Sequence, residues 1–456
     1  MLKLYVIALF AVMAYIAYER PLAGIAFMWV AIWLYPVKGM YGTLWLDIRL
    51  SDLWVVYVTF LAMLKGRTSW SRTLVVRLSL FWFLAILAGD LSGWWLRGGG
   101  NMRPYLKDAF KALYVPCSTL AVGAFLRSER DVRNLLGWLT AAIMAAGLLG
   151  ILMVHYPARF ETFTIPKEKL AWRPEIVAAA DLLRRRARGT MGSPSLAQVS
   201  LVGILLSVCM ATVRIRRNAR IFYACSGLFC LVSLVYTVSR GCITALLCTL
   251  LWAFLVFRRR ERVLALTAVG ICLIVFNVAL LQRLVIRFSG EEGGLTAFMQ
   301  GLQARLTIAR GFLRYPQPAY LFLGVGRIGH KMGTTHNAYI GSFVYSGSPG
   351  IVLLGVLMVY AWRQATRLLR LVADPLSRAL GHFLQMTVLS FGVYAFGAEN
   401  FQSNIPMQLY FAGLAIVSDR LHAIQALRML QRRRQKTPFV EPAPTAQEEP
   451  RTENPS

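Results

Sequence analysis

The chain has 456 residues, of which 57% are hydrophobic and 16% are charged. Soluble globular domains carry about 25% charged residues, so this composition excludes a soluble enzyme, a disordered chain and a fibrous protein. A formal net charge of +29 would suggest nucleic acid in a soluble protein. Here the basic residues lie between apolar runs, so we expect an all-α polytopic membrane protein without a nucleic-acid partner, whose charge serves membrane orientation and an anionic ligand.

Apolar runs that approach the length of a membrane helix, about 20 residues, recur along the whole chain. They predict about twelve transmembrane helices, or thirteen if none of the three short N-terminal runs is re-entrant. The N-terminal run has no small-residue cleavage site, so we interpret it as a retained span. The predicted spans are 2–18, 22–37, 50–64, 74–96, 105–126, 135–155, 190–213, 221–239, 241–257, 263–281, 337–362, 379–398 and 404–420.

Basic clusters orient these spans, because cytoplasmic loops carry an excess of Lys and Arg. This bias predicts a cytoplasmic C-terminus, with the N-terminus outside for thirteen spans and inside for twelve. We expect residues 1–436 to form one membrane domain, and the Pro- and Glu-rich segment 437–456 to be a disordered cytoplasmic tail. The clusters are Lys65–Arg77, Arg127–Arg133, Arg214–Arg220, Arg258–Arg262, Arg363–Arg378 and Arg420–Lys436.

Two long loops, about 156–189 and about 282–336, are predicted on the non-cytoplasmic side, and both are rich in Arg. Long loops partly escape the charge bias, so these residues are either tolerated charges or a cationic surface for phosphate, which the Arg fork binds bidentately. Within the second loop, apolar residues from Leu295 to Leu313 share one helical stripe flanked by Arg305 and Arg310. This pattern predicts an amphipathic helix at the membrane interface.

Three short motifs fall at this same predicted face. The first runs from Arg188 to Ser195, where the first loop enters a span, and the second is the turn Thr237–Gly241 between two spans. The third comprises Gly324-Val325-Gly326, then His336-Asn337-Ala338-Tyr339, then Gly347-Ser348-Pro349-Gly350-Ile351. Their common face makes the non-cytoplasmic side the candidate site.

Two residues in these motifs have side chains suited to chemistry. Arg240 lies in a turn too short to leave the interface, where an ionised Arg snorkels, pairs or meets an anionic ligand. His336 titrates near neutral pH and could take a proton from a hydroxyl, although a lone His at the start of a span is usually structural. Asp90, within an apolar run, is interpreted as facing water or pairing with an Arg, and we leave it outside the catalytic set.

Together the motifs resemble the O-antigen ligase family, whose larger superfamily includes O-antigen polymerases. The resemblance covers roughly residues 105–415, and the sequence departs from the family pattern at Pro194-Ser195, where Asn often follows Pro. It rests on Arg188, the turn Ser239-Arg240-Gly241, Gly324 with Gly326, and His336-Asn337 followed by Gly347-Ser348-Pro349-Gly350.

The resemblance implies glycan transfer from undecaprenyl pyrophosphate to an acceptor hydroxyl at the periplasmic face of the bacterial inner membrane. For a ligase the acceptor is a sugar of lipid A–core, and for a polymerase it is another lipid-linked repeat. We expect His336 as general base and Arg188, Arg240 and Arg305 as pyrophosphate ligands. The chain has no Asp-x-Asp metal motif, so we expect no metal and no cofactor, and no partners beyond donor, acceptor and membrane lipids. A protein O-oligosaccharyltransferase and a transporter are the alternatives.

Overall fold

In the computed structural model, every described element is an α-helix. The structure describes residues 2–33, 50–66, 73–95, 98–156, 193–211, 213, 217–237, 239–256, 303, 307, 318–326, 337–371, 374–396 and 404–436. The helices are α1 (Leu2–Glu19), α2 (Pro21–Trp33), α3 (Leu50–Lys65), α4 (Leu74–Trp95), α5 (Arg103–Ala112), α6 (Tyr114–Phe125), α7 (Glu129–His155), α9 (Ser193–Ala211), α10 (Arg217–Thr237), α11 (Arg240–Val256), α14 (Pro318–Leu323), α15 (Ala338–Leu371), α16 (Pro375–Ala395) and α17 (Asn404–Lys436).

The predicted all-α class is confirmed for the described part of the chain. Each predicted span coincides with one or two helices, except 263–281, which lies outside the described residues together with the tail 437–456. Five helices are long and apolar enough to cross a membrane: α4, α7, α9, α10 and α15. Shorter apolar helices include α2 and residues 241–256 of α11. These helices are those of a membrane protein.

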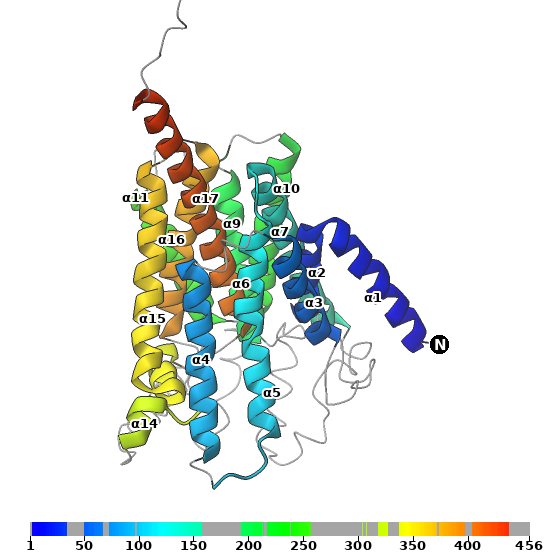
Figure 1. The fold of residues 1–456 in the computed structure, drawn as a ribbon, viewed down its shortest axis with the longest axis vertical. Coiled ribbons are helices and arrows are strands. Elements are labelled where there is room, and N and C mark those ends of the chain that lie inside the picture. Colours follow the sequence, from blue (N-terminus) through cyan, green and yellow to red (C-terminus); the bar gives the residue numbers. More distant parts are fainter. Residues whose placement is uncertain are drawn as a thin grey trace, which may run out of the picture.

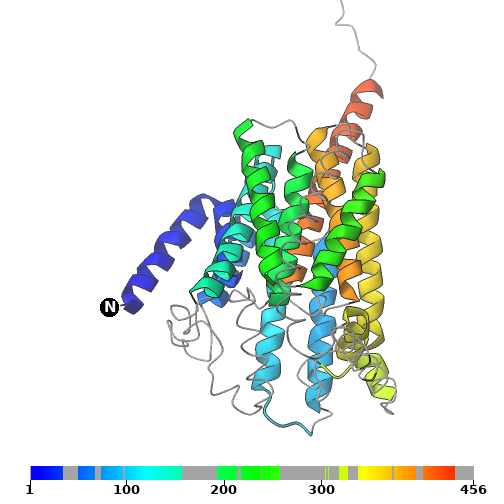
Figure 2. The same ribbon diagram turned by 180° about the vertical axis from the view of Figure 1, so that it is seen from behind.

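The helices form an elongated bundle, from which α1 leans away at one side (Figures 1 and 2). Helix α9 packs along α10, α16 packs against both α11 and α15, and α17 packs against α6. Large side chains such as Trp29, Trp54 and Tyr410 fill the interior. Apolar side chains also face outward, among them Phe81 and Val352. An apolar exterior over an apolar interior suits lipid as the surrounding solvent.

At the upper end of the bundle in Figure 1, charged side chains join three helices. The Arg420 guanidinium lies 3.1 Å from a Glu129 carboxylate oxygen and 3.3 Å from one of Asp374, and it donates to the Ser377 hydroxyl at 2.9 Å. We call Glu129, Asp374, Ser377 and Arg420 the polar clamp. It links α7, α16 and α17, so three of the predicted basic clusters meet at this end.

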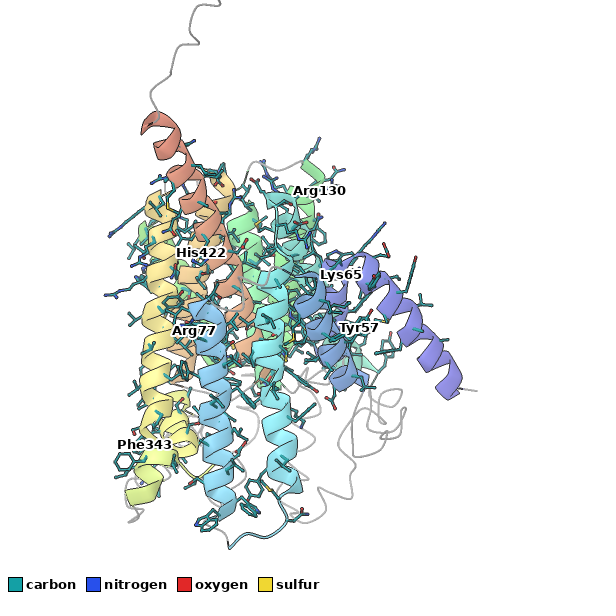
Figure 3. All side chains as sticks on the ribbon, in the orientation of Figure 1. Tyr57, Lys65, Arg77, Arg130, Phe343 and His422 are labelled. Atoms are coloured by element: carbon teal, nitrogen blue, oxygen red, sulfur yellow. The ribbon has the colours of Figure 1, made fainter. Side chains whose placement is uncertain are left out.

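The clamp is attached to helix starts that the sequence encodes locally. Ser128 and Asp131 form a capping box at the start of α7, in which each side chain accepts a hydrogen bond from the other residue's N–H. Asp374 caps α16 by accepting from the Ser377 N–H at 2.7 Å, with Pro375 in the first helical position. Figure 3 labels Arg130 toward this end of the bundle and Phe343, on α15, toward the other.

Helix α17 is the longest element at the upper end, and its second half extends past the other helices (Figure 1). Its residues up to Asp419 are largely buried, whereas Leu427, Met429 and Leu430 are exposed. The Arg428 guanidinium donates to the carbonyl of Leu371 at the end of α15. The helix therefore changes from a packed element to a projecting one within a few turns after the clamp.

Candidate functional site

Most of the predicted site residues lie outside the described residues. These are His336, Arg188 and Arg305, along with most of the loops about 156–189 and about 282–336. Arg240 is the first residue of α11. Within the predicted amphipathic helix, Gln303 and Thr307 are helical, and the Thr307 hydroxyl donates to the Gln303 carbonyl at 2.9 Å. The structure therefore defines the scaffold to which the predicted residues are attached.

The C-terminal end of α16 connects the second and third sequence motifs. On one side, Ser239 and Cys242 interact with the Tyr394 hydroxyl through hydrogen bonds, and a Cβ added to Gly241 would lie 3.1 Å from the Tyr394 ring. On the other side, the Tyr339 hydroxyl donates to the Gly392 carbonyl at 3.0 Å. The turn that contains Arg240 and the helix start that follows His336 therefore pack on the same few residues.

Helix α15 is broken within the third motif. Gly347 has φ 65° and ψ −161°, a conformation essentially restricted to glycine. In a continuous helix the carbonyl of Tyr345 would accept from residue 349, but that residue is proline and has no N–H. The sequence Gly347-Ser348-Pro349-Gly350 therefore separates a short N-terminal segment of α15, residues 338–346, from the long segment that follows.

The Gly-x-Gly segment supplies the donors that the break removes. The N–H of Val325 donates to the carbonyl of Val344 at 2.8 Å, and the N–H of Gly326 donates to the carbonyl of Tyr345 at 3.2 Å. Buried backbone groups need such partners, and none is available from α15 itself for Tyr345. Residues 324–326 thus satisfy the broken helix with backbone groups alone.

This pairing is close enough to exclude side chains. A Cβ on Gly324 would lie 2.5 Å from the N atom of Ser346, and one on Gly326 would lie 2.7 Å from the Asp90 Cα. Both glycines have positive φ, 74° and 66°. Helix α4 is equally close, because a Cβ on Gly89 would meet the Tyr345 carbonyl and one on Gly93 would meet the Val325 carbonyl. The Ser92 hydroxyl donates to the Gly324 carbonyl at 2.9 Å.

We call this arrangement the glycine latch. It comprises Gly89, Ser92 and Gly93 of α4, the segment Gly324–Gly326, and residues 344–347 of α15. It lies toward the lower end of the bundle in Figure 1, where α14 meets α15, opposite the polar clamp.

Sequence reasoning missed the part that α4 plays in this site. The interpretation that Asp90 faces water is wrong, because the residue is 1% exposed and its Oδ1 atom would lie 3.0 Å from a Cβ on Gly326. Burial results from the close approach of α4 to the Gly-x-Gly segment. A signal was present, since Gly89 and Gly93 are four residues apart, the spacing of small residues at close helix contacts in membranes.

A further polar contact joins α7 and α10. The Nε2 atom of His155, the last residue of α7, lies 2.9 Å from the Tyr236 hydroxyl, and the two rings meet edge to face with centroids 5.5 Å apart. Tyr236 lies four residues before Arg240 in the chain. This contact holds the start of the second motif against α7.

Among the described residues, no group of three or more His, Cys, Asp or Glu side chains could hold a metal ion. Comparisons of the sequence with protein-family models and with curated proteins found no match.

Proposed function

We propose that this chain is an O-antigen ligase of the O-antigen ligase and polymerase superfamily. It would transfer glycan from undecaprenyl pyrophosphate to a sugar hydroxyl of lipid A–core. The membrane domain would have about twelve spans in the bacterial inner membrane, with the loop 282–336 and the active site in the periplasm. This orientation follows from the basic clusters, three of which meet at the polar clamp.

One observation carries the proposal: segments far apart in sequence that bear the family-like motifs pack together away from the clamp. The Ser239-Arg240-Gly241 turn packs on Tyr394, and Tyr339, three residues after His336, donates to Gly392 on the same helix end. The Gly324–Gly326 segment pairs with residues 344 and 345 of the helix that begins directly after His336 and Asn337. Unrelated roles for these motifs would not require this convergence.

The chemistry needs one base and fixed positive charge. His336 would take the proton from the acceptor hydroxyl as its oxygen forms a bond to the anomeric carbon of the donor. The bond from that carbon to the pyrophosphate breaks, and negative charge grows on the leaving group. Arg188, Arg240 and Arg305 would stabilise this charge more strongly in the transition state than in the ground state, which is the requirement for acceleration.

The first test is the glycolipid profile of cells that lack the gene, complemented with wild type, His336→Ala, Arg240→Ala or His330→Ala. His330→Ala is the matched control, because it removes an imidazole from the same loop. We expect lipid A–core without O-antigen and long polymer retained on the lipid carrier, with rescue only by wild type and His330→Ala. Normal glycan transfer by correctly inserted His336→Ala and Arg240→Ala proteins would contradict the assignment.

A polymerase of the same superfamily is the second candidate. It uses the same donor and differs in its acceptor. Cells without it would show lipid A–core capped by single repeats, with no long polymer on the core or on the carrier. That profile would replace the ligase proposal with the polymerase. An unchanged lipopolysaccharide profile would reject both and favour a protein or exopolysaccharide acceptor, or transport.

A transporter merits separate consideration because α15 is discontinuous, and transporters use broken helices to bind substrates near the bilayer midplane. In this chain the Gly324–Gly326 backbone satisfies the carbonyls of Val344 and Tyr345 at the break, which leaves those two groups occupied by protein. Purified protein in detergent distinguishes the two classes. Conversion of lipid-linked glycan without any gradient supports the transferase, and a transporter could not perform it.

A further inference from the structure

The helix segment directly after His336 is short and is held at both ends. At its start, the Asn337 side chain accepts hydrogen bonds from the N–H groups of Tyr339 and Ile340, at 2.9 and 3.1 Å. This is an N-cap, which fixes the direction in which the chain enters a helix. At its end, residue 347 breaks the helix, so nine residues from Ala338 to Ser346 form a separate rod.

The rod is fixed to its surroundings by three independent contacts. The latch holds its C-terminal end through the backbone bonds from Val325 and Gly326. The Tyr339 hydroxyl holds its first turn to the Gly392 carbonyl, and the Tyr339 ring packs on Phe396 with centroids 4.9 Å apart. Through the latch the rod is also tied to α4, because Ser92 donates to Gly324.

We propose that Ser92 and Asn337 are positioning residues for the base at position 336. The latch and the cap fix residues 337–346 as a rigid unit, and His336 is the residue that precedes this unit in the chain. Ser92 acts through Gly324, and Asn337 acts through the first turn of α15, so neither needs to touch substrate. This inference rests on the proposed function, because it assigns a role in glycan transfer.

Geometric requirements give the size of the expected effect. Displacement of a reacting group by about 1 Å can lower a rate about 100-fold. Loss of one of several fixing contacts should therefore reduce kcat by about 10- to 100-fold, while the KM for the donor stays within about threefold because the pyrophosphate ligands are unchanged. A residue with a purely structural role would instead lower the amount of folded protein and leave kcat per folded molecule intact.

The test uses the full-length protein purified in detergent, with lipid-linked glycan as donor and lipid A–core as acceptor. Ser92→Ala is compared with Ser79→Ala, which removes a buried hydroxyl from the same helix that bonds only the nearby Val76 carbonyl at 2.7 Å in the structure. Asn337→Ala is compared with Asn337→Ser, because serine is an equally good N-cap. We expect reduced kcat for the first member of each pair and near wild-type kcat for the second.

Amide hydrogen exchange of residues 318–326 supplies a readout that does not depend on activity. Exchange should be faster in Ser92→Ala than in Ser79→Ala if the hydroxyl holds the segment. Equal exchange in the two variants would overturn the latch, and faster exchange with unchanged kcat would overturn the positioning role. A wild-type protein that transfers no glycan would overturn the proposed function, and with it the positioning role, while the exchange data would still report on the latch itself.

Discussion

The two ends of the bundle are held together by different kinds of contact. At the polar clamp, long charged side chains reach across three helices, and Arg420 alone contacts Glu129, Asp374 and Ser377. At the glycine latch, α4, the Gly324–Gly326 segment and α15 approach until backbone touches backbone, and the principal contacts are carbonyls and N–H groups.

The difference has a physical reason. Ion pairs at a water-exposed end tolerate small movements of the helices, since charged side chains are flexible and solvent screens them. Backbone contacts between glycines allow no such adjustment, because the groups are part of the chain and leave no side chain to move. The end that we propose for chemistry is therefore the more precisely fixed of the two. Three changes would sharpen or break this comparison.

The largest effect on stability is expected at the latch, from Gly347→Ala. A Cβ there would meet the Phe322 carbonyl, and the positive φ adds strain of about 1–3 kcal/mol. Thermal unfolding of the purified protein should show a clear loss of stability, or the variant should fail to accumulate. The control is Gly355→Ala on the same helix, where a Cβ would meet nothing within 4 Å and helix propensity should add up to about 1 kcal/mol. Equal melting temperatures for the two variants would show that the latch is not tightly fixed.

A smaller loss is expected at the clamp, from Arg420→Ala. Its guanidinium is only 18% exposed, but its partners Glu129 and Asp374 are 42% and 35% exposed and would be partly solvated after the change. We expect a cost of about 1–2 kcal/mol in the free energy of unfolding, below the usual cost of a fully buried broken pair. Arg363→Ala, which removes an exposed Arg of α15, serves as the control. A clamp variant that is less stable than Gly347→Ala would reverse the ranking of the two ends.

The smallest effect is the pH dependence of the clamp. Burial alone raises the pKa of the Asp374 carboxyl, but hydrogen bonds from Ser377 and the charge and hydrogen bond of Arg420 outweigh it and leave the pKa below its ordinary value. The stabilisation is therefore present above the ordinary carboxyl pKa of about 4 and is lost as the pH falls through the lower folded-state pKa. Melting temperatures from pH 6 downward, each about one unit apart, should fall more steeply for wild type than for Asp374→Asn, which keeps the helix cap. Parallel curves would show that Asp374 contributes no pH dependence.

The sequence predicted the helices well because long apolar runs and caps are local signals. The spans 74–96 and 135–155 correspond to α4 and α7, and the Pro and Gly residues near position 347 mark the break in α15. The contact of α4 with Gly324–Gly326 was not predicted, because it joins residues more than 200 positions apart and depends on side chains that are absent. The burial of Asp90 follows from that contact. The roles of His336, Arg188, Arg240 and Arg305 remain predictions.

The projecting half of α17 has a practical consequence for work on this protein. From Arg420 to Lys436 a helix rises about 24 Å at 1.5 Å per residue. A fluorescent reporter fused after Lys436 would thus be attached about 24 Å from the clamp along the helix axis, and its attachment point would lie outside the packed core. Such a fusion offers a handle for purification and for reading which side of the membrane bears this end of the chain, without touching either the clamp or the latch.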